Sequence, residues 1–327
     1  MIRNFLKNKI FNKTVVIKGS GSIANKHIKI LNKLGLNILI LIKNNKEKKR
    51  YQIKKLNKIS FINNLKNINK KNILFAIIAN STDKHINFIN YFIKEKINIF
   101  CEKPISNKFS NLNSIRKKII KYKNFFYVNY QLKQHEFLKT IIKIVKKEKI
   151  YHAEFRVGQN LKYWRKNKIR KNSYYLNTKK GGGVIFELIH EINLINHILG
   201  NIKKIKTIKS KFNLKNAEDQ AVSIFETEKK IPGTLVQDML SEKKERYIKF
   251  LTKKNLIKFD FIKNKILYYQ KEKIFKIKTL KNNDKINLIE RNIINYLNWL
   301  QKKNFHTTFF DEAVNDLKIC KKMYEKF

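Results

Sequence analysis

The chain has 327 residues and a formal net charge of +50, from 74 Lys and Arg against 24 Asp and Glu. This length gives room for two domains, each with a core of its own. The two cysteines exclude a disulfide framework and have no metal-ligand spacing, and no apolar run is long enough to span a membrane. The N-terminal residues lack the apolar centre of a signal peptide, so we expect a cytoplasmic location.

The positive charge has two interpretations. It is compatible with a nucleic-acid or anionic-membrane binder. It is also typical of the Lys-, Ile- and Asn-rich residue usage of a very A+T-rich genome. Lysines occur along every segment, and Arg, the better reader of phosphates and bases, is rare. We therefore expect the charge to face solvent, with no specific nucleic-acid partner and no membrane partner.

The first half of the sequence alternates predicted strands and helices. A β-branched run predicts a buried strand at 14–18, and helical apolar spacing follows from residue 23 until Gly35. Further strands are predicted at 36–43, 73–80, 97–101 and 125–129, with a helix that ends near residue 94. This alternation indicates an α/β fold with a doubly wound parallel sheet.

Residues 19–24 read G-x-G-x-x-A between the first strand and its helix, which predicts a dinucleotide-binding turn. Gly19 permits the tight turn, Gly21 lets the backbone approach a pyrophosphate, and Ala24 keeps the helix close to the strand. The helix N-terminus, at Ser22 and Ile23, offers N–H groups and a positive dipole end. The alternative is an ordinary tight turn.

The form of the cofactor depends on the end of the second strand. A Rossmann unit usually carries an acid there, roughly 20 positions past the glycines, to bind the adenosine ribose. Residues 43–46 contain no acid, and Lys43 and Lys46 could pair with a 2′-phosphate. We therefore expect NAD(P)(H), with a slight preference for NADP(H).

The second half has a different pattern, so we place a domain boundary between residues 130 and 131. A Rossmann domain is expected at 1–130, and a substrate-binding and oligomerisation domain at 131–327. Strands follow one another with short turns, as in a mostly antiparallel sheet of an α+β domain. They are predicted at 151–160, 202–212, 219–227, 232–240, 246–252, 256–262, 265–269 and 273–278, with helices near 134–148, 184–199, 284–303 and 309–326.

Five of the nine glycines lie in two clusters, and the second, at 181–183, precedes a polar line on the predicted helix 184–199. The line comprises Glu187, His190, Asn193 and His197, and it is flanked by apolar residues. A histidine beside a carboxylate and an amide in such surroundings suits proton transfer. A buried histidine with a purely structural role is the alternative.

Four stretches together resemble the Gfo/Idh/MocA oxidoreductases, the group of glucose–fructose oxidoreductase and inositol dehydrogenase. The stretches span nearly the whole chain, and the third and fourth are the most specific. They are the glycine turn at 19–24, the sequence A-N-S-T-D-K-H at 79–85, E-K-P at 102–104, and the Gly-Gly-Gly helix with His190. The sequence L-K-Y-W-R at 161–165 is similar to a subgroup found with surface-polysaccharide and nucleotide-sugar genes.

The resemblance implies a role for each matching residue. Lys103 would be the catalytic lysine beside the nicotinamide, and His190 the acid/base histidine. Independently of the resemblance, Glu187 lies one turn before His190 on the predicted helix and could orient it. The cofactor cleft would be lined by Asn80, Ser81, His85 and Glu102, and the substrate would be contacted by Lys103, Tyr130, Lys133, Trp164, Arg165, His190 and Asn193.

Three positions depart from the family pattern. Glu187 precedes His190 by three residues instead of four, Asn193 replaces a carboxylate, and Ser81 replaces a proline. Asn193 can bind a sugar hydroxyl but carries no charge. We predict a homo-oligomeric NAD(P)-dependent dehydrogenase of a sugar or nucleotide-sugar. The alternatives are a non-catalytic relative that still binds ligand, a nucleic-acid binder, and a different reductase on the same fold.

Overall fold

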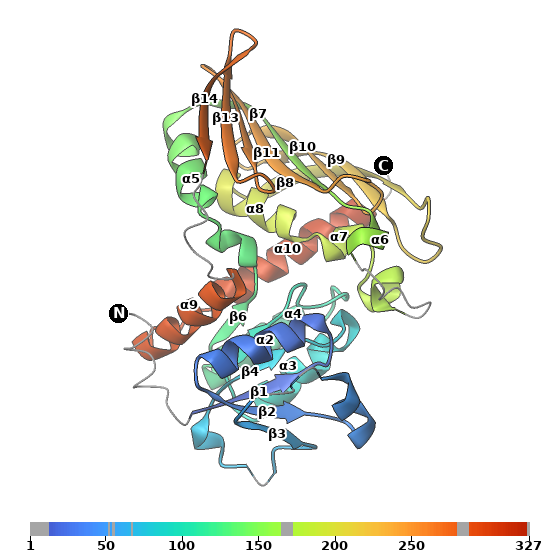
Figure 1. The fold of residues 1–327 in the computed structure, drawn as a ribbon, viewed down its shortest axis with the longest axis vertical. Coiled ribbons are helices and arrows are strands. Elements are labelled where there is room, and N and C mark those ends of the chain that lie inside the picture. The colour runs from blue at the N-terminus through green and yellow to red at the C-terminus, as the bar shows by residue number, and fades with distance from the viewer. Residues whose placement is uncertain are drawn as a thin grey trace. The chain divides into compact units, whose positions relative to one another are not determined.

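The structure, a computed structural model, describes residues 13–51, 53, 56–66, 68–164, 173–279 and 288–325. The chain divides into two compact units (Figure 1). Unit 1 comprises Met1–Asn129 and Asn287–Val314, and unit 2 comprises Tyr130–Ile286 and Asn315–Phe327. Each unit contains a sheet of its own.

Unit 1 contains a six-stranded parallel sheet in the order β3-β2-β1-β4-β5-β6. This confirms the predicted doubly wound arrangement. The strands are β1 Thr14–Lys18, β2 Asn37–Leu41, β3 Ile59–Ile62, β4 Ile73–Ile78, β5 Ile99–Cys101 and β6 Phe126–Val128. The prediction missed β3, a four-residue edge strand that is only half-buried and so lacks a continuous apolar run.

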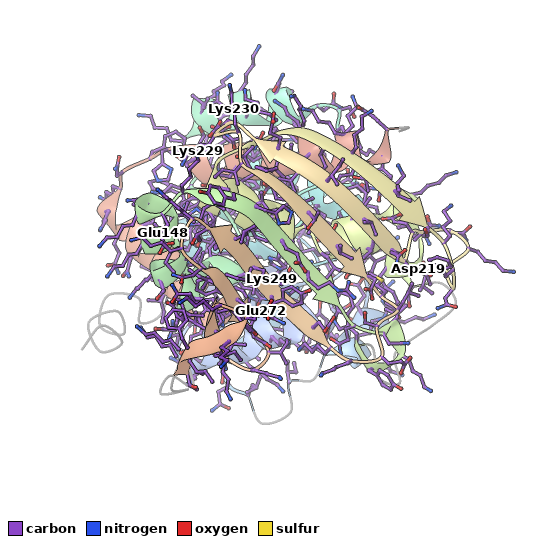
Figure 2. The ribbon with its side chains drawn as sticks, turned by 90° about the horizontal axis from the view of Figure 1, so that it is seen from above. Glu148, Asp219, Lys229, Lys230, Lys249 and Glu272 are labelled. Carbon is purple, nitrogen blue, oxygen red and sulfur yellow. The ribbon has the colours of Figure 1, made fainter. Side chains whose placement is uncertain are left out.

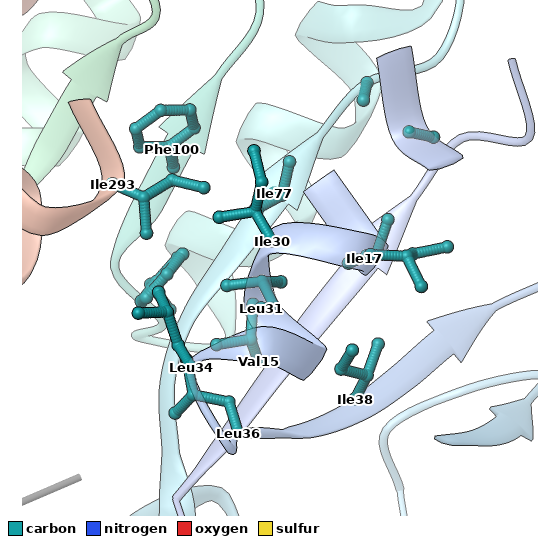
Figure 3. Packing of buried hydrophobic residues seen from close by; sticks show 14 of the residues in the cluster. Val15, Ile17, Ile30, Leu31, Leu34, Leu36, Ile38, Ile77, Phe100 and Ile293 are labelled. Carbon is teal, nitrogen blue, oxygen red and sulfur yellow. The ribbon is translucent and has the colours of Figure 1, made fainter. Parts of the chain in front are cut away.

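The core of unit 1 follows the two-residue period of its strands. Val15 and Ile17 of β1 point to one face and pack beneath Leu31 of a helix, as Figure 3 shows, whereas Val16 points to the other face. The helices of this unit are α2 Ser22–Lys33, α3 His85–Lys94, α4 Leu112–Tyr122 and α9 Leu288–Lys302. Short 3-10 turns lie at η1 Asn45–Arg50, η2 Lys70–Asn72 and η3 Thr82–Lys84.

Helix α9 belongs to unit 1, although it follows the second sheet in the sequence. Tyr296 of α9 is fully buried, its ring centre lies 5.0 Å from that of Phe75, and its hydroxyl donates to the Phe125 carbonyl at 2.7 Å. The expected division assigned all of 131–327 to one domain. The two units differ from it here because hydrophobic periodicity shows that a helix has an apolar face but not which core receives it.

Unit 2 contains an eight-stranded sheet in the order β14-β13-β12-β11-β7-β10-β9-β8. It is mostly antiparallel, as predicted, with one parallel pair between β7 and β10. The strands are β7 Ile150–Gly158, β8 Ile202–Ser210, β9 Gln220–Thr227, β10 Pro232–Asp238, β11 Glu245–Thr252, β12 Leu256–Asp260, β13 Lys265–Gln270 and β14 Lys273–Thr279.

One face of this sheet is apolar and covered, and the other is exposed and mixed. Phe155, Phe250 and Phe259 are buried on the covered face. On the other face, Lys249 of β11 forms an ion pair with Glu154 at 2.6 Å, and Figure 2 shows this sheet with Lys249 labelled. The helices and 3-10 turns are η4 Gln131–Gln134, α5 Phe137–Lys147, α6 Leu161–Trp164, η5 Tyr174–Leu176, η6 Thr178–Lys180, α7 Val184–Glu187 and α8 His190–Leu199. The last helix, α10 Thr308–Tyr324, begins in unit 1 and belongs to unit 2 from Asn315 on.

The prediction of one continuous helix over 184–199 is wrong, because the backbone breaks between α7 and α8. Leu188 leaves the helical conformation at φ −107° and ψ 27°. Its carbonyl accepts a hydrogen bond at 2.9 Å from Nε2 of Gln237, a buried residue of β10. A partner on a distant strand thus stabilises the break, which the local apolar pattern cannot reveal.

No helix in the described ranges is long and apolar enough to cross a bilayer.

Candidate active site

The glycine turn of unit 1 combines one crowded position with one open position. Gly19 has φ +136°, and a Cβ there would overlap the carbonyl of Ala79 at the end of β4. Gly21 is the N-cap of α2, and among the described residues, its two chain neighbours aside, no atom lies within 4 Å of where a Cβ would be. Gly19 is therefore required for the backbone to turn, and the space beside Gly21 is available to a ligand.

The first turn of α2 is suited to bind an anion. Ser22 and Ile23 lie at the helix N-terminus, where N–H groups have no intrahelical acceptor, and Ala24 is fully buried against the strand. No side-chain cap hydrogen bond from a described residue closes this end. Ser22, Ile23 and Ala24 thus lie in the first turn of α2, next to Gly21, and their role in dinucleotide binding stays a prediction.

The structure places a carboxylate at the end of β2, which the sequence analysis missed. Oε2 of Glu47, in η1, accepts a hydrogen bond from the backbone N–H of Lys43 at 2.9 Å and lies 3.5 Å from Nζ of Lys18. Glu47 is the next residue after the segment 43–46 that was searched for an acid. The argument for NADP(H) from a missing acid therefore loses its basis.

Three predicted cofactor residues follow β4. Asn80 has a buried Oδ1 with no hydrogen-bond partner among the described residues, and Ser81 is the N-cap of η3. His85 is buried, and its Nδ1 and Nε2 lie 2.8 Å and 3.1 Å from the carbonyl oxygens of Pro104 and Asn80. Burial lowers the pKa of His85. This histidine therefore joins the segment after β4 to E-K-P, whereas Asn80 retains capacity for a ligand.

The E-K-P segment follows β5, and a buried network fixes its glutamate. Oε1 of Glu102 lies 2.7 Å from Nε2 of His27 in α2 and accepts a hydrogen bond at 2.7 Å from Nδ2 of Asn129. Burial alone would raise the pKa of Glu102, but the contacts with His27 and Asn129 lower it below its usual value. Asn129 in turn accepts from Asn292 of α9 at 2.7 Å. Lys103, next in sequence, is half-buried.

In unit 2, His190 begins α8 and is buried. The ring of Tyr130 meets it edge to face, with ring centres 5.9 Å apart. Glu187 is also buried but ends α7, so the two residues are not one turn apart on a continuous helix as the sequence suggested. Lys133, in η4, is half-buried and follows Tyr130.

The remaining predicted substrate residues have different surroundings. Nδ2 of Asn193 donates to Oδ2 of Asp316 in α10 at 2.8 Å, and Asn196 donates to the other oxygen of the same carboxylate at 2.8 Å. Asn193 thus connects α8 to α10. Trp164 ends α6 and is half-buried, and Arg165 lies outside the described residues.

Another buried glutamate, Glu218, was absent from the prediction and supports the Gly-Gly-Gly turn. Glu218 accepts hydrogen bonds from the Tyr324 hydroxyl at 2.7 Å, the Thr178 hydroxyl at 3.1 Å and the Ile185 N–H at 3.2 Å. A Cβ on Gly183, which has φ +90°, would overlap its carboxylate. Sequence could not reveal this contact, because Glu218 precedes an ordinary strand 35 residues after the turn.

Comparison with known families identifies the class of protein. Residues 13–130 match the Gfo/Idh/MocA oxidoreductase family model for the NAD-binding Rossmann fold, and residues 139–256 match the Gfo/Idh/MocA C-terminal domain. The chain belongs to this family. No curated protein matches the sequence.

Solved structures share the fold at low identity. A UDP-N-acetylglucosamine 3-dehydrogenase from Acidithiobacillus ferrooxidans has a TM-score of 0.77 and 11% identity over 96% of this chain and 97% of that one. A 3-ketoreductase from Actinomadura kijaniata, in complex with TDP-benzene and NADP, has a TM-score of 0.81 and 9% identity over 95% of this chain and 96% of that one. The WlbA dehydrogenase from Bordetella pertussis, in complex with NADH and UDP-GlcNAcA, has a TM-score of 0.75 and 15% identity over 96% of this chain and 95% of that one.

Proposed function

We propose that this protein is an NAD(P)-dependent oxidoreductase that transfers a hydride between nicotinamide and a hydroxyl or ketone carbon of a sugar or nucleotide-sugar. The glycine turn carries the proposal, because Gly21 leaves open space at a helix N-terminus while Gly19 closes the turn against β4. The E-K-P segment follows β5 at the same carboxyl edge of the sheet, where α/β proteins bind ligands. The UDP-GlcNAcA bound to the Bordetella pertussis dehydrogenase, and the UDP-N-acetylglucosamine 3-dehydrogenase activity named for the Acidithiobacillus ferrooxidans protein, support the substrate class.

The dinucleotide would be held by the turn at 19–24 and by Asn80, whose buried Oδ1 offers an acceptor. When bound, its nicotinamide supplies the site that accepts or returns the hydride. Lys103 holds the substrate oxygen with a cationic hydrogen bond, which strengthens as negative charge develops on that oxygen. The contacts of Glu102 with His27 and Asn129 hold the backbone next to this lysine.

His190 takes the proton from the substrate hydroxyl during oxidation and returns it during reduction. An imidazole suits this role because its ordinary pKa, about 6.5, is close to neutral pH. The ring of Tyr130 packs edge to face with the His190 ring and restricts the orientation of the imidazole. In this proposal Glu187 orients the histidine, and Tyr130, Lys133, Trp164, Arg165 and Asn193 contact the substrate.

The proposal includes a homo-oligomer, formed through the exposed face of the eight-stranded sheet. Large apolar side chains on four strands of this sheet are at least a third exposed, namely Tyr151, Ile208, Val222, Ile224 and Leu251. Exposed apolar area of this kind is typical of an association surface.

Specific nucleic-acid binding is not expected. Duplex DNA should bind only with a steep salt dependence and without sequence preference.

The catalytic assignment is tested with Lys103→Ala and His190→Asn in single-turnover assays on a panel of UDP- and TDP-sugars with NAD⁺ or NADP⁺. Loss of a general acid or base typically costs roughly 10²–10⁴-fold in rate, so each variant should lose about that much. Matched controls are Lys108→Ala, an exposed lysine in the same loop, and His197→Asn, an exposed histidine on α8. Both should keep the wild-type rate.

Thermal unfolding of each variant separates chemistry from stability. A folded Lys103→Ala protein that transfers hydride at nearly the wild-type rate would remove the assignment of this lysine. If the wild type binds dinucleotide but turns over none of the panel, the non-catalytic relative becomes the better interpretation. Turnover of other carbonyl compounds in place of sugars would indicate a different reductase on the same fold.

A further inference from the structure

The 3-10 turn after β2 directs one of its side chains inward. In η1, Asn45–Arg50, only Glu47 is partly buried, with 24% of its side chain exposed, and the other five residues are exposed to solvent. Those five include Lys46, and Lys43 just before the turn is exposed as well. The two lysines that could pair with a 2′-phosphate therefore face solvent, while the acid faces the sheet.

The Glu47 carboxylate lies at the carboxyl ends of two neighbouring strands. Its Oε2 accepts from the backbone N–H of Lys43, two residues after β2, and lies 3.5 Å from Nζ of Lys18, the last residue of β1. Strands β1 and β2 are paired in parallel, so their ends share one edge of the sheet. Lys18 immediately precedes Gly19, which places this carboxylate beside the start of the dinucleotide-binding turn.

Lys18 is held in place and is not available to an incoming phosphate. Its Nζ donates to the Leu41 carbonyl at 3.0 Å, pairs with Glu47, and lies 5.2 Å from the ring centre of Phe88. Only 12% of its side chain is exposed. A phosphate that approached this point would have to displace Glu47 from Lys18 or meet the carboxylate directly.

A carboxylate at this point discriminates between the two dinucleotides. It can accept hydrogen bonds from the 2′- and 3′-hydroxyls of an adenosine ribose, whereas it repels a 2′-phosphate. The contacts of Glu47 with Lys18 and with the Lys43 N–H both use Oε2, and a carboxylate has roughly four lone-pair positions, so Oε1 can accept from a ribose.

We propose that Glu47 is the specificity-determining residue for the cofactor, and that it selects NAD(H) over NADP(H). The proposal rests on the proposed function, because it assumes that the glycine turn binds a dinucleotide. It reverses the slight preference for NADP(H) that the sequence suggested, since that preference depended on the absence of an acid at the end of β2.

The test is a fluorescence titration of the full-length protein with NADH and with NADPH, which reads binding without turnover. Because hydrogen bonds to a charged group are worth roughly 1.5–3 kcal/mol, NADH should bind at least about tenfold more tightly than NADPH. Glu47→Gln should lose that preference by about the same factor, with weaker NADH binding and stronger NADPH binding. Glu47→Asp should retain part of it, because the charge is kept.

The matched control is Glu95→Gln. Glu95 resembles Glu47 in having 20% of its side chain exposed and in pairing with a lysine, Lys70, but it ends α3 just before β5, at the opposite edge of the sheet. Its substitution should leave the NADH-to-NADPH ratio unchanged. Lys18→Met removes the ion pair with Glu47 but retains the acid, so it separates the effect of a lost ion pair on stability from the effect of a lost carboxylate on cofactor preference. This variant should keep the preference for NADH.

Each outcome decides between the possibilities. A wild-type protein that prefers NADPH, or a folded Glu47→Gln variant with an unchanged ratio, would overturn the assignment of Glu47 and leave the proposed function intact. Failure of wild-type protein to bind either dinucleotide would overturn the proposed function, and the assignment of Glu47 with it. Loss of the preference for NADH over NADPH in Glu47→Gln but not in Glu95→Gln would establish Glu47 as the residue that selects the cofactor.

Discussion

The two glycine-rich turns at 19–21 and 181–183 both precede a helix, but the space beside one glycine of each turn is filled differently. In unit 1, no described residue other than the chain neighbours of Gly21 comes within 4 Å of the position that a Cβ on Gly21 would take. In unit 2, the corresponding space beside Gly183 is occupied by the Glu218 carboxylate, which also binds the Ile185 N–H near the start of α7. Predicted site residues lie on the helices that follow the two turns: Ser22 and Ile23 on α2, and Glu187 and His190 on α7 and α8.

The difference shows what a glycine in such a turn is for. Where the protein leaves the space open, backbone N–H groups remain available to a ligand from outside. Where a side chain of the protein occupies the space, the same groups are already satisfied, and the glycine serves packing. The turn of unit 2 is therefore a support for α7 and α8, which carry Glu187 and His190, and not a second anion site.

The largest effect should come from Gly183→Ala. The new methyl group would overlap Glu218, and φ +90° is unfavourable for alanine. Overpacking and backbone strain together should destabilise the protein by roughly 3 kcal/mol or more. Urea unfolding measures this loss.

A double variant sharpens the result. Glu218→Ala removes the carboxylate that the methyl group meets, so Gly183→Ala should cost less in that background than in the wild type. Additive effects would show that Glu218 does not occupy the space beside Gly183, and the comparison between the two turns would then fail.

Much of the fold could be predicted because local patterns carry it. The parallel sheet follows from apolar runs such as 73–78, which are buried on both faces, and the second sheet follows from alternating strands such as β9, where buried and exposed residues alternate. The strand, turn and helix around Gly19 and Gly21 could be predicted for the same reason, since the three are adjacent in sequence.

The parts that escaped prediction depend on contacts between distant residues. The break after Glu187 is stabilised by Gln237, and Asn193 is engaged by Asp316, 123 residues away. Glu47 escaped for a different reason. It lies near the expected position of an acid, but only the geometry of η1 shows that its side chain turns back to the end of β2.

An intermediate effect is expected from Gly21→Ala. Because a Cβ there meets no atom of the described part of the chain beyond its neighbours, and φ is −81°, stability should change by no more than about 0.5 kcal/mol. The methyl group would occupy the approach of the pyrophosphate, so binding of the preferred dinucleotide should weaken by at least about tenfold, or about 1.4 kcal/mol. Isothermal titration calorimetry and urea unfolding measure the two effects separately.

The control is Gly35→Ala, at the other end of the same helix. Gly35 has φ +81° and open space around it, so alanine should cost roughly 1–2 kcal/mol of stability through the backbone conformation alone. Dinucleotide binding should be unchanged. Equal loss of binding in both variants would mean that Gly21→Ala acts through the helix and not through the ligand space.

The smallest effect concerns the pH dependence of the turn in unit 2. Burial raises the pKa of Glu218 above its usual value, and the hydrogen bonds it accepts only partly oppose this shift. The folded protein therefore holds the Glu218 proton more tightly than the unfolded chain. The contribution of this residue to the free energy of unfolding is full at low pH and is lost as pH rises through the folded-state pKa.

Glu218→Gln removes that titration, so the free energy of unfolding of wild type minus that of the variant should fall as pH increases from 4 to 8. Glu102→Gln is the matched comparison, because the pKa of Glu102 is lowered by His27 and Asn129 despite its burial. Its contribution is lost as pH falls, so the corresponding difference should rise with pH. Urea unfolding at several pH values measures both slopes. Slopes of the same sign would contradict the expected opposite pKa shifts of Glu218 and Glu102. The two buried carboxyl groups would then respond to desolvation alone and not to their different hydrogen-bond partners.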